Sequence, residues 1–266
     1  MRVLYLDCFS GISGDMTIAA LLDAGASLDL LERELNKLNI TSEYELKCEK
    51  VIRNGITSSK FDVILLNEKN NSDNHVHTHT EEHAHDHAHS HNHDHHQRTY
   101  REIVKMINNA SLVDRAKEYA LAIFKKIGEA EASIHGVSLE EVHFHEVGAV
   151  DSIIDIVGTA ILIDQLKIER IIASSVPVGS GHIHIDHGIY PVPAPATLEM
   201  LRGVPIATSN VHAELTTPTG AAIVSVLSSD FGTFPEMKVN EIGYGAGTKI
   251  FTNHPNVLRV VIGDKE

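Results

Sequence analysis

A segment that cannot form a core divides this sequence into two parts. Residues 71–97 hold eleven of the chain's 19 histidines, five acidic residues and only three aliphatic side chains, Val76, Ala84 and Ala88. Such a composition buries too little apolar surface to offset the entropy lost when a chain becomes ordered. We therefore expect a disordered histidine-rich loop at 71–97, inserted into a single large domain built from residues 1–70 and 98–266.

The overall composition excludes several classes of protein. The chain has 266 residues, is 42% hydrophobic and contains two cysteines, so neither a fully disordered protein nor a disulfide scaffold fits. Its formal net charge of −14 argues against a nucleic-acid partner. No secretory leader opens the chain, and the apolar stretch 153–163 is too short to span a bilayer. We expect a soluble cytoplasmic protein without a membrane partner.

Hydrophobic periodicity and capping signals predict alternating strands and helices, typical of an α/β or α+β fold with a mixed sheet. The predicted strands are 2–7, 44–53, 60–67, 169–178, 205–208, 239–244 and 256–262. The predicted helices are 16–24, 27–38, 99–109, 112–135, 151–166, 195–201 and 218–227.

Alternating histidines in the inserted segment indicate metal capture. Imidazole binds borderline divalent ions well, and Ni²⁺ and Cu²⁺ stand high in the affinity order. A flexible chain can wrap an ion with any two or more of these rings, although a solvated loop that binds metal adventitiously has the same composition. The candidate ligands here are His83, His85, His87, His89, His91 and His93.

A second candidate site lies at residues 143–155. His143 and His145 point the same way if the segment is extended, and with Glu146 they offer three metal ligands, or two ligands and a base. Surface histidines at a helix end are the alternative. Asp151 and Asp155 follow at a spacing that places both on one side of a helix, although Asp151 can equally be its N-cap.

Two later segments also combine chemistry-bearing residues. His182 and His184 share a face of an extended run within 179–188, which we interpret as a secondary metal site or an exposed turn. Glu214 is a candidate ligand or base. Thr216 and Thr217 precede a helix whose free N–H groups suit an anion, although simple N-capping explains them as well.

The opening loop between the first strand and the first helix is rich in glycine and serine. Such a loop can cradle a phosphate, and the candidate contacts are Ser10, Gly11, Ser13 and Gly14. No Gly-Lys-Ser/Thr follows, so the loop is not a Walker A motif. Alternatively, Asp7 and Asp15 could hold a metal ion.

Four motifs in order resemble one known family. Asp7–Met16, the run 143–158, Pro-Val-Pro-Ala-Pro-Ala-Thr at 191–197 and Glu-Leu-Thr-Thr-Pro-Thr-Gly-Ala-Ala at 214–222 are similar to motifs of the nickel-insertion proteins that mature the nickel-pincer cofactor of lactate racemase. A histidine-rich insertion before the second motif is also typical of that family. Family members continue into a further C-terminal domain, so the resemblance identifies this chain as an N-terminal part.

The resemblance implies an activity and partners. Such proteins insert Ni²⁺ into pyridinium-3,5-bisthiocarboxylic acid mononucleotide, using CTP with Mg²⁺ or Mn²⁺, and we associate CTP mainly with the C-terminal domain. His143, His145, Glu146 and Glu214 would then be ligands or bases. The expected partners are the mononucleotide substrate, the family's C-terminal domain, lactate racemase or its maturation proteins, and further copies of the chain in a homo-oligomer.

Two other hypotheses compete with a nickel-inserting chelatase of the lyase class. A non-catalytic nickel store or metallochaperone would need only the histidine-rich segment. A metal-dependent phosphohydrolase would use Asp7, Asp15 and histidines. A pure store has no need of the glycine loop or of the threonine-rich helix start, both of which suit anions.

Overall fold

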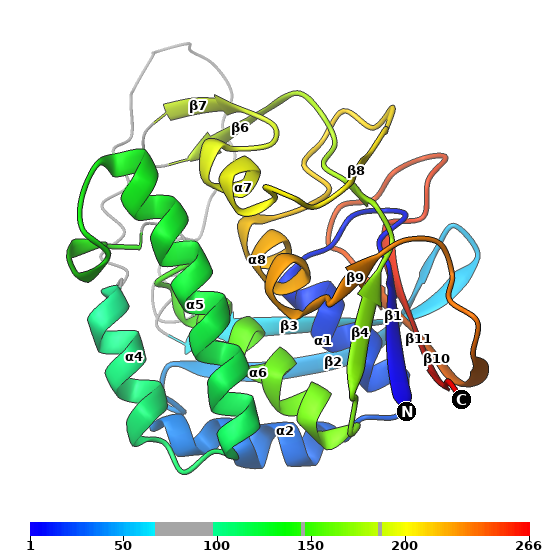
Figure 1. Ribbon diagram of the computed structural model, residues 1–266, viewed down its shortest axis with the longest axis horizontal. Coiled ribbons are helices and arrows are strands. Elements are labelled where there is room, and N and C mark those ends of the chain that lie inside the picture. The colour runs from blue at the N-terminus through cyan, green and yellow to red at the C-terminus, as the bar shows by residue number, and fades with distance from the viewer. Residues whose placement is uncertain (67–97, 145–146, 186–187) are drawn as a thin grey trace, which may run out of the picture.

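Strands from both sides of the histidine-rich segment join one mixed sheet. The computed structural model describes residues 1–66, 98–144, 147–185 and 188–266 (Figure 1). The seven strands lie in the order β2-β3-β10-β11-β1-β4-β9. Their bounds are β1 (Arg2–Asp7), β2 (Tyr44–Arg53), β3 (Ile56–Leu65), β4 (Arg170–Ala173), β9 (Asp230–Phe231), β10 (Lys238–Ala246) and β11 (Val257–Asp264). The predicted fold class, α/β with a mixed sheet, is confirmed.

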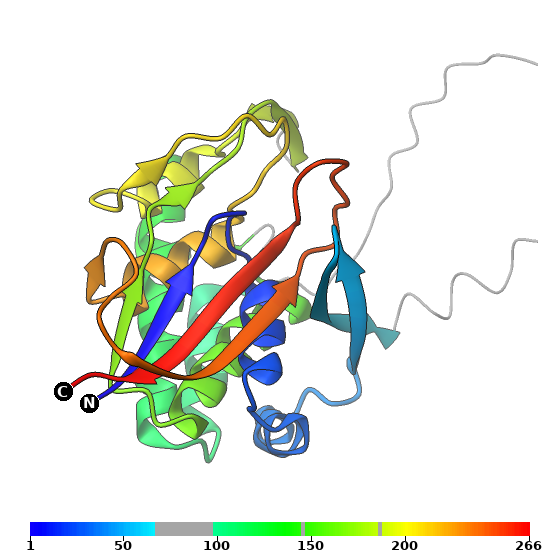
Figure 2. The ribbon, with the colours of Figure 1, turned by 90° about the vertical axis from the view of Figure 1, so that its right-hand side faces the viewer.

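Helices gather on one side of the sheet formed by β1, β4, β10 and β11, as Figure 2 makes visible. They are α1 (Gly14–Asp23), α2 (Leu28–Leu35), α4 (Tyr100–Asn109), α5 (Asp114–His135), α6 (Val150–Gln165), α7 (Pro195–Met200) and α8 (Pro218–Leu227), with short 3₁₀ turns η1 (Asn36–Leu38) and η2 (Leu139–Glu141). Helix α1 packs on β10, β3 and α6, so its position is fixed from several sides.

The first and the last strands lie side by side at the centre of the sheet. β1 pairs antiparallel with β11 along its whole length and parallel with β4. Because side chains alternate along a strand, Leu4 and Leu6 enter the helix-side core, while Val3 and Tyr5 belong to a small cluster on the opposite face. Phe234 packs edge-on against Tyr5 there.

Local capping signals place the helix boundaries. Thr99 and Glu102 form the predicted capping box of α4, and Gly136 ends α5 in the left-handed conformation. The N-cap of α6 is Ala149, so Asp151 lies in the first turn and is not the N-cap.

Several short strands were not predicted as such. His182–Ile185 (β6) and Gly188–Pro191 (β7) form a hairpin, although the sequence there indicated a loop. The predicted strand 169–178 divides into β4 and β5 (Val176–Pro177), and β5 pairs with β8 (Ile206–Ala207), which confirms the strand predicted at 205–208. β9 is also short and exists through its pairing with β4.

The two described residues that flank the histidine-rich segment both contact Glu43. The backbone N–H of Leu66 donates to the carbonyl oxygen of Glu43 at 3.0 Å. From the other flank, Nη2 of Arg98 donates to both carboxylate oxygens of Glu43, at 2.6 and 2.8 Å. The prediction of a disordered loop concerns residues outside those described.

No helix within the described ranges has the length and apolar character needed to cross a membrane. The cytoplasmic location remains a prediction.

Candidate functional site

One cleft collects residues from three of the four motif segments. It consists of two adjoining hollows of about 270 and 180 Å³, and Ser13, Asp15, Glu214 and Thr217 line both of them. We call the larger hollow the acidic half, because Asp151 and Asp155 also line it, and the smaller one the lysine half, because Lys249 lines it. The other residues of the acidic half are Gly14, Val147, Ser152, Pro218 and Thr219, and those of the lysine half are Met16, Leu215, Gly247, Thr248 and Asn256.

Backbone pairing brings the opening loop against the threonine-rich helix start. The N–H of Ile12 donates to the carbonyl of Leu215 at 3.1 Å, and the N–H of Thr217 donates to the carbonyl of Ile12 at 3.1 Å. Gly11 permits this approach, because a Cβ atom at that position would lie 1.9 Å from the Leu215 oxygen. The pairing sets the Ser13–Asp15 turn beside Glu214 and Thr217.

Three helices begin at the acidic half. Lining residues of this hollow include the first turns of α1, α6 and α8, among them Asp15, Asp151 and Thr219. The free N–H groups at a helix start carry partial positive charge, which stabilises nearby carboxylates. The fold therefore concentrates carboxylates here and offsets part of their mutual repulsion.

Asp155 stands at the centre of this electrostatic arrangement. Loss of solvent raises the pKa of its carboxyl well above the usual value, and the charges of Asp15 and Asp151 raise it further. Its Oδ1 is inaccessible to solvent and has no hydrogen-bond partner among the described residues. Gly14 lies against this side chain, since a Cβ atom there would sit 2.5 Å from Oδ2 of Asp155.

Asp15 is held in place by two neighbours. The hydroxyl of Ser13 donates to its Oδ1, and Nζ of Lys60 lies 3.4 Å from its Oδ2. Lys60 is only 6% exposed and also contacts the carbonyl of Phe61, at 3.1 Å, and the carboxylate of Asp62. A buried ammonium with several oxygen partners fixes the direction of the Asp15 carboxylate.

Residues 247–256, which we call the lysine loop, form the outer wall of the lysine half. Nδ2 of Asn256 donates to the carbonyl of Lys249 at 2.9 Å. Nδ2 of Asn54, in the β2–β3 turn, donates to the carbonyl of Thr252 at 3.0 Å. Nε2 of His254 lies 2.7 Å from the hydroxyl oxygen of the buried Ser10. The loop is therefore fixed at several points.

The structure brings seven of the candidate residues together and places others elsewhere. The seven that line the cleft are Ser13, Gly14, Asp15, Asp151, Asp155, Glu214 and Thr217.

The remaining predicted residues of the opening loop and the helix start line neither half. Asp7 forms an ion pair with Arg259 on the neighbouring strand. Ser10 bonds to His254, Gly11 packs on Leu215, and the buried Thr216 donates its hydroxyl to the carbonyl of Pro177 at 2.8 Å.

The histidines of the described ranges do not line the cleft. His143 is exposed and pairs through its backbone with Thr99. His182 and His184 are exposed on β6 and share a face, as their spacing predicts. Within the described ranges, no three His, Cys, Asp or Glu side chains are already placed to hold a metal ion. Other predicted ligands lie outside the described residues: His145, Glu146, His83, His85, His87, His89, His91 and His93.

Sequence reasoning overlooked the two lysines of the site. Lys60 belongs to a strand and Lys249 to a late loop, and neither stands in a motif. In the sequence, each is a single lysine in a weakly charged stretch. Such lysines are common on protein surfaces and do not indicate a site. Both become recognisable only when the fold brings them to Asp15 and to the cleft.

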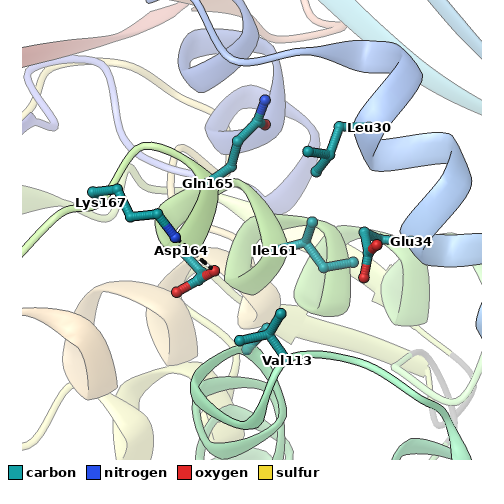
Figure 3. A pocket seen from close by; sticks show the side chains of 8 residues that line it. Leu30, Glu34, Val113, Ile161, Asp164, Gln165 and Lys167 are labelled. Atoms are coloured by element: carbon teal, nitrogen blue, oxygen red, sulfur yellow. Dashed lines mark hydrogen bonds and ion pairs between the residues drawn. The ribbon is translucent and has the colours of Figure 1, made fainter.

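A second pocket of about 280 Å³ lies between α2, α5 and α6, away from the motifs (Figure 3). Leu30, Val113 and Ile161 form its apolar part. Asp164 and Lys167 at its rim form an ion pair with each other. No residue of the four motifs lines it, so we do not assign the chemistry to this pocket.

Comparisons with known proteins show a family match that spans all four motif segments. Residues 4–266 match the family described as "Nickel insertion protein". A pyridinium-3,5-bisthiocarboxylic acid mononucleotide nickel insertion protein of Geobacillus kaustophilus is 50% identical over 265 residues. Proteins of the same name from Clostridium kluyveri and Clostridium acetobutylicum are 51% and 53% identical. No solved structure matches the chain.

The aligned region covers all of this chain in these three relatives, but only 60%, 63% and 65% of their own lengths. The family match extends across the strands and helices that build the cleft. The chain belongs to the family of nickel insertion proteins.

Proposed function

We propose that this chain takes part in inserting Ni²⁺ into pyridinium-3,5-bisthiocarboxylic acid mononucleotide, the molecule named in its relatives. The observation that carries the proposal is the convergence of Asp15, Asp155 and Glu214 on one cleft from three separate motif segments. Nickel and the mononucleotide are both substrates in this reaction, and the cleft offers carboxylates and hydrogen-bond donors side by side.

The donor set of the acidic half suits a site that passes nickel on. Carboxylate oxygens are harder ligands than sulfur, and thiocarboxylate sulfur binds a borderline ion such as Ni²⁺ more strongly. Transfer of nickel from the protein's oxygens to the two sulfur atoms of the substrate therefore lowers the free energy.

A nickel–carbon bond, which resemblance to the family implies, also requires a base. The ring carbon must lose its proton when it binds nickel, and a carboxylate within reach can accept it. Glu214 lines both halves of the cleft and is our candidate for this role. The roles of His143, His145 and Glu146 as ligands or base remain predictions, as does nickel gathering by the histidine-rich segment.

The finer parts of the proposal follow from the family resemblance. They include the use of CTP with Mg²⁺ or Mn²⁺ through a C-terminal domain, and delivery of the product to the maturation of lactate racemase. Assembly into a homo-oligomer belongs to the same set of predictions. Since the chain spans about two thirds or less of its relatives' length, we propose that it contributes the nickel-binding cleft to that reaction.

The test is a nickel-insertion assay. The chain is incubated with Ni²⁺, the mononucleotide, CTP and Mg²⁺, with and without the C-terminal portion of a relative, and the product is identified by mass spectrometry. Asp15→Asn and Glu214→Gln should each lower the initial rate by about a hundredfold, the scale of a lost acid–base or charge interaction. Glu34→Gln, in the second pocket, is the matched control and should retain the wild-type rate.

The rival functions give different results. A nickel store binds several weak ions per chain, and calorimetric titration with nickel is then unaffected by the mononucleotide. A phosphohydrolase releases phosphate from a generic phosphate ester. Absence of the nickel-containing product, with either of these results, would overturn the proposal.

A further inference from the structure

The two halves of the cleft differ in charge. Asp151 and Asp155 line only the acidic half, and Lys249 lines only the lysine half. Among the described residues that line either hollow, Lys249 is the only cationic side chain. A ligand that carries separate cationic and anionic groups would therefore take one orientation in this cleft.

We propose that the lysine half binds the phosphate of the mononucleotide, with Lys249 as the cation that contacts it. This inference rests on the proposed function, because the mononucleotide is the substrate named there. A phosphate monoester carries close to two negative charges at neutral pH. Asp15 and Glu214 line both halves, so the halves differ by the carboxylates of Asp151 and Asp155 in one and the ammonium of Lys249 in the other. In the half that Asp151 and Asp155 do not line, the ammonium and neutral hydrogen-bond donors stabilise the phosphate.

The lysine half supplies suitable neutral donors around Lys249. Thr217, Thr248 and Asn256 line the same hollow and offer hydroxyl and amide groups. The N-cap residue of α1, Ser13, makes no side-chain capping bond, so the first N–H groups of that helix add partial positive charge to the wall. The hollow of about 180 Å³ is large enough for a phosphate group.

The contacts of the lysine loop preorganise this position. Asn256 is only 8% exposed and binds the carbonyl of Lys249 itself, while the N–H of Gly247 donates to the carbonyl of Asn256 at 3.0 Å. The guanidinium of Arg53 donates to the carbonyl of Gly247 at 3.3–3.4 Å. The backbone that carries Lys249 is thereby fixed before a ligand arrives, which lowers the entropy lost on binding.

The shared wall sets how one molecule would occupy both halves. Asp15 and Glu214 line both hollows, so a ligand whose phosphate lies at Lys249 reaches the carboxylates with its pyridinium ring. The ring, whose two thiocarboxylate groups bind the nickel ion, then faces the acidic half. The bound phosphate thereby fixes the orientation of the ring.

The test compares two ligands and three proteins by isothermal titration calorimetry. The ligands are the mononucleotide and the riboside made from it by removal of the phosphate. The proteins are the wild-type chain, Lys249→Gln and the control Lys238→Gln, an exposed lysine on β10 that lines neither half. The unfolding midpoint of each protein in urea is measured alongside.

We expect the wild-type chain to bind the mononucleotide at least about tenfold more tightly than the riboside, the scale of one charge-assisted contact. Lys249→Gln should remove most of this difference by weakening the mononucleotide alone, and Lys238→Gln should change neither affinity. Equal affinity of the wild-type chain for the two ligands, no binding of either, or an equal loss for both ligands in Lys249→Gln would overturn the inference.

Failure of this inference is distinguishable from failure of the proposed function. If Lys249→Gln forms the nickel product with an unchanged KM for the mononucleotide, the phosphate site is wrong and nickel insertion stands. If the affinity difference depends on Lys249 but no nickel product forms, the phosphate site stands and the proposed function is wrong.

Discussion

Asp155 is a carboxyl group whose ionisation the fold opposes. Its pKa is raised in the folded chain by burial and by neighbouring carboxylates, relative to the ordinary value near 4 expected in the unfolded chain. A carboxyl group whose pKa is raised by folding stabilises the folded state at pH values below its pKa in the unfolded chain. This stabilisation is lost as the pH rises toward the pKa in the folded chain.

We therefore predict that Asp155→Asn removes the loss of folding stability that ionisation of this buried carboxyl group causes. The variant should be more stable than the wild-type chain at pH 7, and the difference should shrink as the pH approaches 4. Urea unfolding followed by circular dichroism at a series of pH values checks this. Identical pH profiles for the two proteins would show that Asp155 ionises freely in the folded chain.

Gly14 is a residue where the cleft has no room for a methyl group. In Gly14→Ala, the new Cβ would meet the Asp155 side chain at 2.5 Å, so the carboxyl or the helix start must shift. We expect a loss of about 1–3 kcal/mol in the free energy of unfolding, the usual cost of overpacking. Gly232→Ala is the matched control, since its Cβ meets nothing within 4 Å, and it should unfold like the wild-type chain.

At the scale of elements, α8 depends on the cap that also shapes the cleft. The hydroxyl of Thr217 accepts a hydrogen bond from the N–H of Gly220 at 3.2 Å. Thr217→Ala should lower the free energy of unfolding by about 1 kcal/mol, whereas Thr217→Ser keeps the hydroxyl and should lose little. Thermal unfolding of both variants measures the difference, and equal losses would mean that the methyl group and not the cap matters.

Elements with strong local signals could be predicted from the sequence, and elements that depend on distant partners could not. The capping box at Thr99 and the glycine at Gly136 gave the bounds of α4 and α5 to within about two residues. β9 has two residues and exists because β4 lies beside it, so no local pattern announces it.

The same distinction applies to the candidate site. Ser13, Asp15, Glu214 and Thr217 belong to motifs that the sequence displays, and the fold brings them together. Lys60 and Lys249 come from a strand and a loop without a motif, and only the pairing of β3 with β10 and the anchored loop place them there. Which motif residues converge is therefore a property of the topology.

At the scale of the whole molecule, we predict that the fold and the cleft are kept when the histidine-rich segment is removed. Deletion of residues 71–97 should leave the unfolding midpoint close to that of the wild-type chain, because both flanks contact Glu43 in the remaining fold. From the composition of the segment, we predict that the deletion raises the nickel concentration needed for half-maximal insertion and leaves the rate at saturating nickel unchanged.

The matched control keeps the length of the segment and replaces its eleven histidines by serine. It should behave like the deletion in the nickel-insertion assay. Loss of turnover at saturating nickel in either variant would mean that the segment takes part in the reaction itself.

The contacts of Glu43 with Leu66 and Arg98 have a consequence for how this protein can vary. An inserted segment whose two flanks contact the same residue puts no strain on the sheet, whatever the length of the segment. Doubling the length of such a segment costs only about 0.6 kcal/mol in closure entropy. Glu43 therefore marks a position in the fold at which segments with other metal preferences can be exchanged without a change in the sheet.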